Sequence, residues 1–123
     1  MKTILVVDDN PQVRQSLCEL LRQQYPQMRV LAVPNGQEAL FTALSENPGV
    51  IVLDGEMPIM NGYEAAHRLR QMPRTQRIPL VAYTGEQEAN AIVSGLRRLC
   101  DAYLSKSASD SQIMTTMAPF MTA

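Results

Sequence analysis

Several classes of protein are excluded by what this sequence lacks. The first apolar run, residues 4–7, is interrupted by Asp8 and Asp9, so it is too short for the hydrophobic core of a signal peptide. No later stretch approaches the roughly 20 apolar residues of a membrane-spanning helix. We therefore expect a cytoplasmic location and no membrane partner.

Cysteine and unbalanced charge are also scarce. Cys18 and Cys100 stand far apart and match no metal-binding or redox spacing, which favours small apolar thiols in a reducing compartment. The formal net charge is −1, without the basic face that nucleic-acid binding requires, so we expect no direct nucleic-acid partner. The densest basic cluster is Arg68, Arg70, Arg74 and Arg77. Its simplest interpretation is a solvated helix end and loop.

What remains is the pattern of one α/β domain, which we assign to residues 1–123. Apolar runs predict strands at residues 4–7, 29–33, 50–53, 78–83 and 102–104. Helical spacing predicts helices at about residues 11–24, 63–70 and 86–99, one between the turns at 34–36 and 47–49, and one that starts after Ser109 or Asp110. Parallel strands need crossover connections, so the alternation predicts a five-stranded, doubly wound parallel sheet with helices on both faces.

Polar residues follow the predicted strands where each of them ends. Asp8 and Asp9 come after the first strand, Asp54 after the third, Thr84 after the fourth, and Lys106 after the fifth. In sheets of this kind the ligand site lies beyond the carboxyl ends of the strands. The fold would therefore bring these scattered residues to one edge.

The residue types at this edge indicate phosphoryl transfer. Carboxylates held close together repel one another, and a hard divalent cation such as Mg²⁺ relieves that repulsion. Lys106 supplies a compact positive charge for phosphate, and Thr84 supplies a hydroxyl donor. Taken singly, Asp8-Asp9-Asn10-Pro11 is more often a capped turn, and Asp54 could be an ordinary strand-end residue. The convergence of all of them carries the prediction.

These landmarks resemble the receiver domains of two-component response regulators. The resemblance covers nearly the whole chain and includes the spacing between its motifs. The matching residues are Asp8-Asp9, Asp54, Met57-Pro58, Asn61-Gly62, Thr84 and Tyr103-Leu104-Ser105-Lys106. It implies a flavodoxin-like fold and a histidine kinase or histidine phosphotransfer protein as the phosphoryl donor.

The resemblance also implies a role for each matching residue. Asp54 would accept the phosphoryl group. Mg²⁺ would be bound by Asp9, Asp54 and the backbone carbonyl of Glu56, with Asp8 acting through water. Lys106 and Thr84 would contact the phosphoryl group. Tyr103 would follow Thr84 inward and change the surface formed by the fourth helix, fifth strand and fifth helix, where a downstream protein or output domain would bind.

Three positions make this chain distinctive within that pattern. Ser107 replaces a proline that often follows a cis peptide bond, so either the Lys106–Ser107 bond is trans with altered Lys106 placement, or the bond is cis before a non-proline residue. Glu56 and Glu86 each lie two residues beyond a site residue, at positions where the family tunes the lifetime of the phosphoryl group. We expect both acids to modulate hydrolysis.

Two other functions remain open from the sequence. A receiver-like module could work purely by binding, without phosphorylation. A small Mg²⁺-dependent phosphohydrolase could use Asp54 as its nucleophile, although the chain has no spare segment for a substrate cap. We expect a phosphoacceptor that catalyses only its own phosphorylation and dephosphorylation, and so not an enzyme with a separate substrate.

Overall fold

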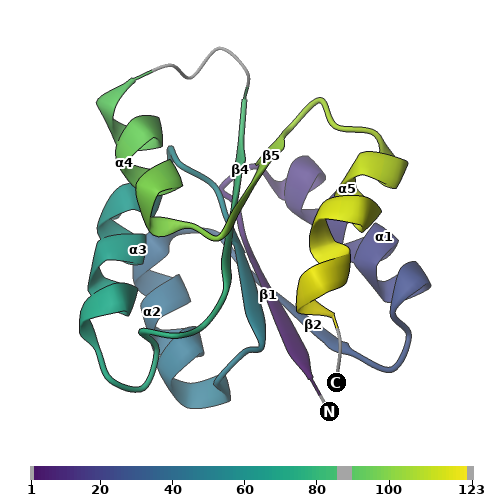
Figure 1. Ribbon diagram of the computed structural model, residues 1–123, viewed down its shortest axis with the longest axis horizontal. Helices are drawn as coiled ribbons and strands as arrows, with labels where there is room; N and C mark the ends of the chain where they lie inside the picture. The colour runs from purple at the N-terminus through teal and green to yellow at the C-terminus, as the bar shows by residue number, and fades with distance from the viewer. Residues whose placement is uncertain (1, 86–89, 122–123) are drawn as a thin grey trace.

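A computed structural model describes residues 2–85 and 90–121 of the protein. Within those ranges, one parallel sheet has the strand order β2-β1-β3-β4-β5 (Figure 1). Its strands are β1 (Thr3–Val7), β2 (Arg29–Val33), β3 (Val50–Leu53), β4 (Leu80–Thr84) and β5 (Ala102–Ser105). The predicted doubly wound, parallel architecture is confirmed.

Helices cover both faces of this sheet, as predicted. The described α-helices are α1 (Pro11–Gln24), α2 (Gly36–Glu46), α3 (Gly62–Gln71), α4 (Ala91–Leu99) and α5 (Asp110–Met117), and a short 3₁₀-helix, η1, follows at Ala118–Phe120. α2, α3 and α4 lie on one side of the sheet, and α1 and α5 lie on the other (Figure 1). The strands are buried on both sides, which explains their continuous apolar runs.

Each α-helix begins at a side-chain cap. The caps are Asn10, Asn35, Asn61, Asn90 and Ser109, whose side-chain oxygens accept backbone N–H groups of the first turn. Such caps replace hydrogen bonds that the first turn cannot make internally. α4 therefore begins at Ala91, because Asn90 is extended and caps it. The predicted start at residue 86 lies outside the described residues.

One boundary differs from the prediction, namely the start of the strand predicted at residues 78–83. The N–H of Ile78 donates to the Thr75 carbonyl in a turn, so β4 begins only at Leu80, and it extends to Thr84. Helix α5 starts after Ser109, as predicted, and ends at Met117, just before the 3₁₀-helix that contains Pro119.

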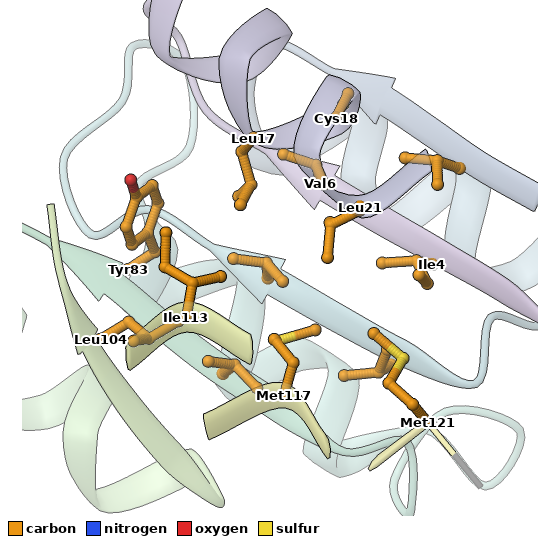
Figure 2. Close-up of a cluster of buried hydrophobic side chains, with 14 residues drawn as sticks. Ile4, Val6, Leu17, Cys18, Leu21, Tyr83, Leu104, Ile113, Met117 and Met121 are labelled. Carbon is orange, nitrogen blue, oxygen red and sulfur yellow. The ribbon is translucent and has the colours of Figure 1, made fainter. Parts of the chain in front are cut away.

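The core forms two layers because neighbouring strand residues point to opposite faces. Ile4 and Val6 face α1 and α5, where they pack with Leu17, Leu21 and Met117 (Figure 2). The alternate residues of β1 pack in the layer under α2, α3 and α4. Burial of each large aliphatic side chain stabilises the fold by about 1.5–3 kcal/mol. Across the described ranges, no helix is both long enough and apolar enough to span a membrane.

Arg70 of the basic cluster is a structural residue. The interpretation of the cluster as a solvated helix end and loop is therefore wrong for Arg70. The half-buried Arg70 guanidinium donates to the carbonyls of Gln76, Ile78 and Leu99 and pairs with Asp101 at 3.0 Å. Asp101 in turn accepts the Leu80 N–H at 2.9 Å. Arg70 thereby joins the ends of α3 and α4 to the beginnings of β4 and β5.

We predict that Arg70→Gln lowers the free energy of unfolding by about 2 kcal/mol, because several carbonyls, those of Ile78 and Leu99 part-buried, lose their donor at once. The same change at the exposed Arg68 on the same helix should lower it by less than about 0.5 kcal/mol. Urea unfolding followed by circular dichroism measures both. Equal losses in the two variants would show that the Arg70 network has no special role.

Candidate functional site

The predicted polar residues do meet at the carboxyl edge of the sheet, which is the upper edge in Figure 1. Val7 and Leu53 are paired in adjacent strands, so the next residues, Asp8 and Asp54, lie side by side. The Asp54 N–H donates to the Val7 carbonyl at 3.0 Å. Register between the two central strands therefore fixes the distance between these carboxylates.

Asp8, Asp9 and Asp54 form an acidic cluster that could hold a metal ion. One carboxylate oxygen from each lies within 4.8 Å of the others. Asp8 and Asp54 are each only 1% exposed, whereas Asp9 is exposed. Asp8 Oδ2 is buried, and the Lys106 ammonium lies 3.1 Å from it. Hard oxygen ligands and the mutual repulsion of the carboxylates fit Mg²⁺.

Lys106 supplies the positive charge of the site. Its ammonium lies 3.1 Å from Asp8 Oδ2 and 3.2 Å from Asp54 Oδ2. Burial by itself lowers the pKa of Lys106, but Asp54 and Asp8 outweigh that effect and hold the pKa above its ordinary value. The group therefore stays charged at neutral pH and links the two buried carboxylates.

Ser107 is accommodated in a tight turn. No peptide bond among the described residues is cis, so the Lys106–Ser107 bond is trans. The Ser105 hydroxyl accepts the Ser107 N–H at 3.2 Å and lies 2.9 Å from the Ser107 hydroxyl, while the Ala108 N–H donates to the Ser105 carbonyl. This turn still places the Lys106 ammonium next to both carboxylates.

The predicted switch residues are in direct contact. Thr84 is fully buried at the end of β4, and its hydroxyl donates to the Tyr103 hydroxyl at 3.1 Å. The Arg97 guanidinium lies over the Tyr103 ring at 4.1 Å from the centroid, a cation–π contact from α4. Thr84 and Tyr103 thus form a continuous link between the site edge and the outer surface of α4 and β5.

Glu56 lines the open side of the site but is oriented toward α4. It borders the same cleft as Asp9, Asp54 and Lys106. Its Oε1 accepts the Asn90 side-chain N–H at 2.5 Å. Glu86, the other predicted modulator, lies outside the described residues.

Sequence reasoning missed two supports of the site. Arg14 donates to the Asp8 backbone carbonyl at 2.6 Å, and its place in the first turn after Asp8-Asp9 was the available signal. Gly62 packs against the phosphoacceptor loop, where an added Cβ would lie 2.0 Å from the Asp54 carbonyl oxygen. The sequence alone identifies Asn61-Gly62 only as part of a motif. Both residues fix the backbone that positions the carboxylates.

Comparison with known proteins places this geometry in a family. The family model for the response regulator receiver domain matches residues 4–118. Protein PilH of Pseudomonas aeruginosa is 31% identical over 117 residues, which is 95% of this chain and 95% of PilH. The chain belongs to the response regulator receiver domain family. Such domains are phosphoacceptor modules of two-component signalling and interact with histidine kinases or phosphotransfer proteins.

Solved structures agree on the fold. The chemotaxis protein CheY4 of Vibrio cholerae has a TM-score of 0.85 at 24% identity, over 98% of this chain and 99% of that one. The response regulator Rcp1, solved in its Mn²⁺-bound form, has a TM-score of 0.77 at 25% identity, over 94% of this chain and 88% of that one. Some curated relatives are longer, and this chain spans 47% of one and 41% of another.

The raised pKa of Lys106 predicts a pH dependence. Its contribution to stability should be fully present below the ordinary lysine pKa of 10.5 and should be lost as pH rises through the higher folded value. The difference in unfolding free energy between the wild type and Lys106→Met should therefore stay constant up to about pH 10 and shrink as pH rises above 10.5. Chemical denaturation across that range measures the difference.

Lys106→Arg is the control, because a guanidinium stays protonated throughout. The difference in unfolding free energy between Lys106→Arg and Lys106→Met should stay constant over the same pH range. If the difference in unfolding free energy between the wild type and Lys106→Met is equally constant, the assigned pairing of Lys106 with Asp8 and Asp54 is contradicted.

Proposed function

We propose that Asp54 accepts a phosphoryl group from a histidine kinase or histidine phosphotransfer protein, in a Mg²⁺-dependent reaction that the domain catalyses on itself. The observation that carries the proposal is the buried Asp54 carboxylate beside the Lys106 ammonium at 3.2 Å, within an acidic cluster at the sheet edge. A carboxylate nucleophile next to fixed positive charge is what phosphoryl transfer needs.

The transfer exchanges one bond for another. An Asp54 oxygen attacks phosphorus, the bond from phosphorus to the donor imidazole nitrogen breaks, and an acyl phosphate forms. Water later attacks the phosphorus and releases inorganic phosphate, which restores the carboxylate. Lys106 stabilises the charge on the phosphoryl oxygens, and its pairing with Asp8 holds it in place.

The residues present fit the expected metal site. Asp9, Asp54 and the Glu56 carbonyl would hold Mg²⁺, and Asp8 would act through water. When bound, Mg²⁺ neutralises charge on the phosphoryl oxygens. The exposed Asp9 lies at the entrance, where it can take up the ion without rearrangement of the core.

The signal then passes through Thr84 and Tyr103. The Thr84 hydroxyl donates to Tyr103, so a phosphoryl oxygen at Asp54 would compete for that donor. Once Thr84 turns toward the phosphoryl group, Tyr103 loses its partner and its contact with Arg97 is free to change. We infer that the α4–β5–α5 face is the binding surface for a downstream protein or output domain.

The cytoplasmic location and the lack of direct nucleic-acid contact remain predictions from the sequence. Both are consistent with a module whose output is a protein contact. Neither is needed for the phosphoryl chemistry proposed for Asp54.

We predict that acetyl phosphate with Mg²⁺ adds one phosphoryl group to the protein, measured as the mass increase of the intact chain. Asp54→Asn should abolish the increase, and chelation of Mg²⁺ should reduce its rate by at least about 100-fold, since charge neutralisation of this kind provides several kcal/mol. Asp110→Asn, the same change at an exposed aspartate of α5, should react normally.

Other outcomes discriminate the alternative functions. Continuous release of phosphate from small phosphate esters, without a stable adduct, would identify a phosphohydrolase. Absence of any adduct in the wild type would favour a module that works by binding alone.

We predict that Glu56 and Glu86 set the lifetime of the phosphoryl group. A charge near the attacking water changes its energy by about 1 kcal/mol, so Glu56→Gln and Glu86→Gln should each change the hydrolysis rate about fivefold. Loss of phosphoryl from the purified adduct, followed by mass, gives the rate. If neither variant differs from the wild type, the two acids have no such role.

A further inference from the structure

Asn90 makes two hydrogen bonds from one side chain. Its Oδ1 accepts the Val93 N–H at 3.0 Å and caps α4, while its Nδ2 donates to Glu56 Oε1 at 2.5 Å. The second bond joins a neutral amide to a carboxylate and is therefore of the stronger, charge-assisted kind. The cap of α4 is thus bonded to the residue that lies two positions beyond Asp54.

The charge of Glu56 also suits the end of this helix. α2, α3 and α5 carry an acidic residue in their own first turn, namely Glu38, Glu64 and Asp110, whereas α4 carries none in its own. Negative charge near a helix N-terminus stabilises the helix. Glu56 brings such a charge to α4 from the loop between β3 and α3.

The loop between Asp54 and Glu56 lies against α4 at Gly55. Gly55 is buried, and an added Cβ there would lie 3.3 Å from Thr84 Cγ2 and 3.5 Å from Val93 Cγ2. On its other side, the Gly55 carbonyl accepts the Gly62 N–H at 2.8 Å. The segment that carries Glu56 therefore packs close to the first turn of α4.

We propose that Asn90 is a positioning residue for Glu56. The hydrogen bond between these two side chains links the loop that contains Asp54 and Glu56 to the N-terminus of α4. Binding of Mg²⁺ at the acidic cluster then restrains Glu56 and, through Asn90, the first turn of α4. The second step rests on the proposed function, which assigns the Glu56 carbonyl to the metal. The positioning role itself depends only on contacts within the protein.

The positioning role is tested without metal. Asn90→Ser keeps an oxygen that caps α4 but loses the side-chain N–H, Glu56→Ala removes the acceptor, and Glu56→Gln keeps one. Hydrogen exchange of the Val93 and Ser94 amides, which donate to Asn90, reports on the first turn. Asn90→Ser and Glu56→Ala should each accelerate exchange about fivefold, and the double variant should be no faster than either single variant.

Two controls accompany this measurement. Glu56→Gln should accelerate exchange less than Glu56→Ala does, because its amide oxygen still accepts the bond although the charge is lost. Asn35→Ser makes the same change at the cap of α2 and should leave α4 unaffected. The positioning role would be overturned if the effects of the two single variants on the exchange rate add in the double variant. It would also be overturned if exchange in Glu56→Ala is as slow as in the wild type.

A titration with Mg²⁺ alone, followed by amide chemical shifts, tests the transmission to α4. In the wild type, amides next to the acidic cluster and amides in the first turn of α4 should shift together. In Asn90→Ser the shifts in α4 should fall by about half or more, while those near Asp9 remain. Equal α4 shifts in both proteins would overturn the transmission. No shift anywhere in the wild type would overturn the metal assignment and the transmission together, whereas the metal-free exchange would still decide the positioning role.

Discussion

The site depends on the placement of Lys106 between two buried carboxylates. Asp8 and Asp54 are almost inaccessible to water, and an isolated buried charge destabilises a protein by several kcal/mol. One ammonium within 3.2 Å of both offsets much of that cost. The remaining negative charge of the acidic cluster favours a divalent cation there, and that cation together with Lys106 would offset the negative charge of a phosphoryl group.

The rest of the architecture serves this arrangement. Adjacent, parallel β1 and β3 force Asp8 and Asp54 together, and the turn after β5 brings in Lys106. The helix cap Asn10 follows soon after β1, so the loop that carries Asp8 and Asp9 is short. The Arg70 network links α3, α4 and the beginnings of β4 and β5 at the opposite edge of the sheet.

Much of this could be predicted from the sequence because it depends on local patterns. Continuous apolar runs such as Val50–Leu53 specify buried parallel strands, and Asp54 at the end of such a run must then lie at the carboxyl edge. Apolar periodicity alone does not show which polar residue caps a helix, so it cannot fix the start of α4. Asn90 carried that signal.

Contacts between distant segments could not be predicted in this way. Arg70 looked like one member of a solvated basic cluster, since its carbonyl partners lie in other elements. The bond between Glu56 and Asn90 joins two loops and has no sequence spacing to reveal it. The effect of Ser107 likewise depended on the hydroxyl of Ser105, which only the folded turn brings close.

The most direct test of the account is to locate the phosphoryl group. Asp8 and Asp54 are equally buried and equally close to Lys106, so chemical environment alone does not separate them. Borohydride reduces an acyl phosphate of aspartate to homoserine, whose position can be read from peptide fragment masses. The account predicts homoserine at position 54 alone. Reduction at Asp8, Asp9 or Glu56, with position 54 intact, would contradict it.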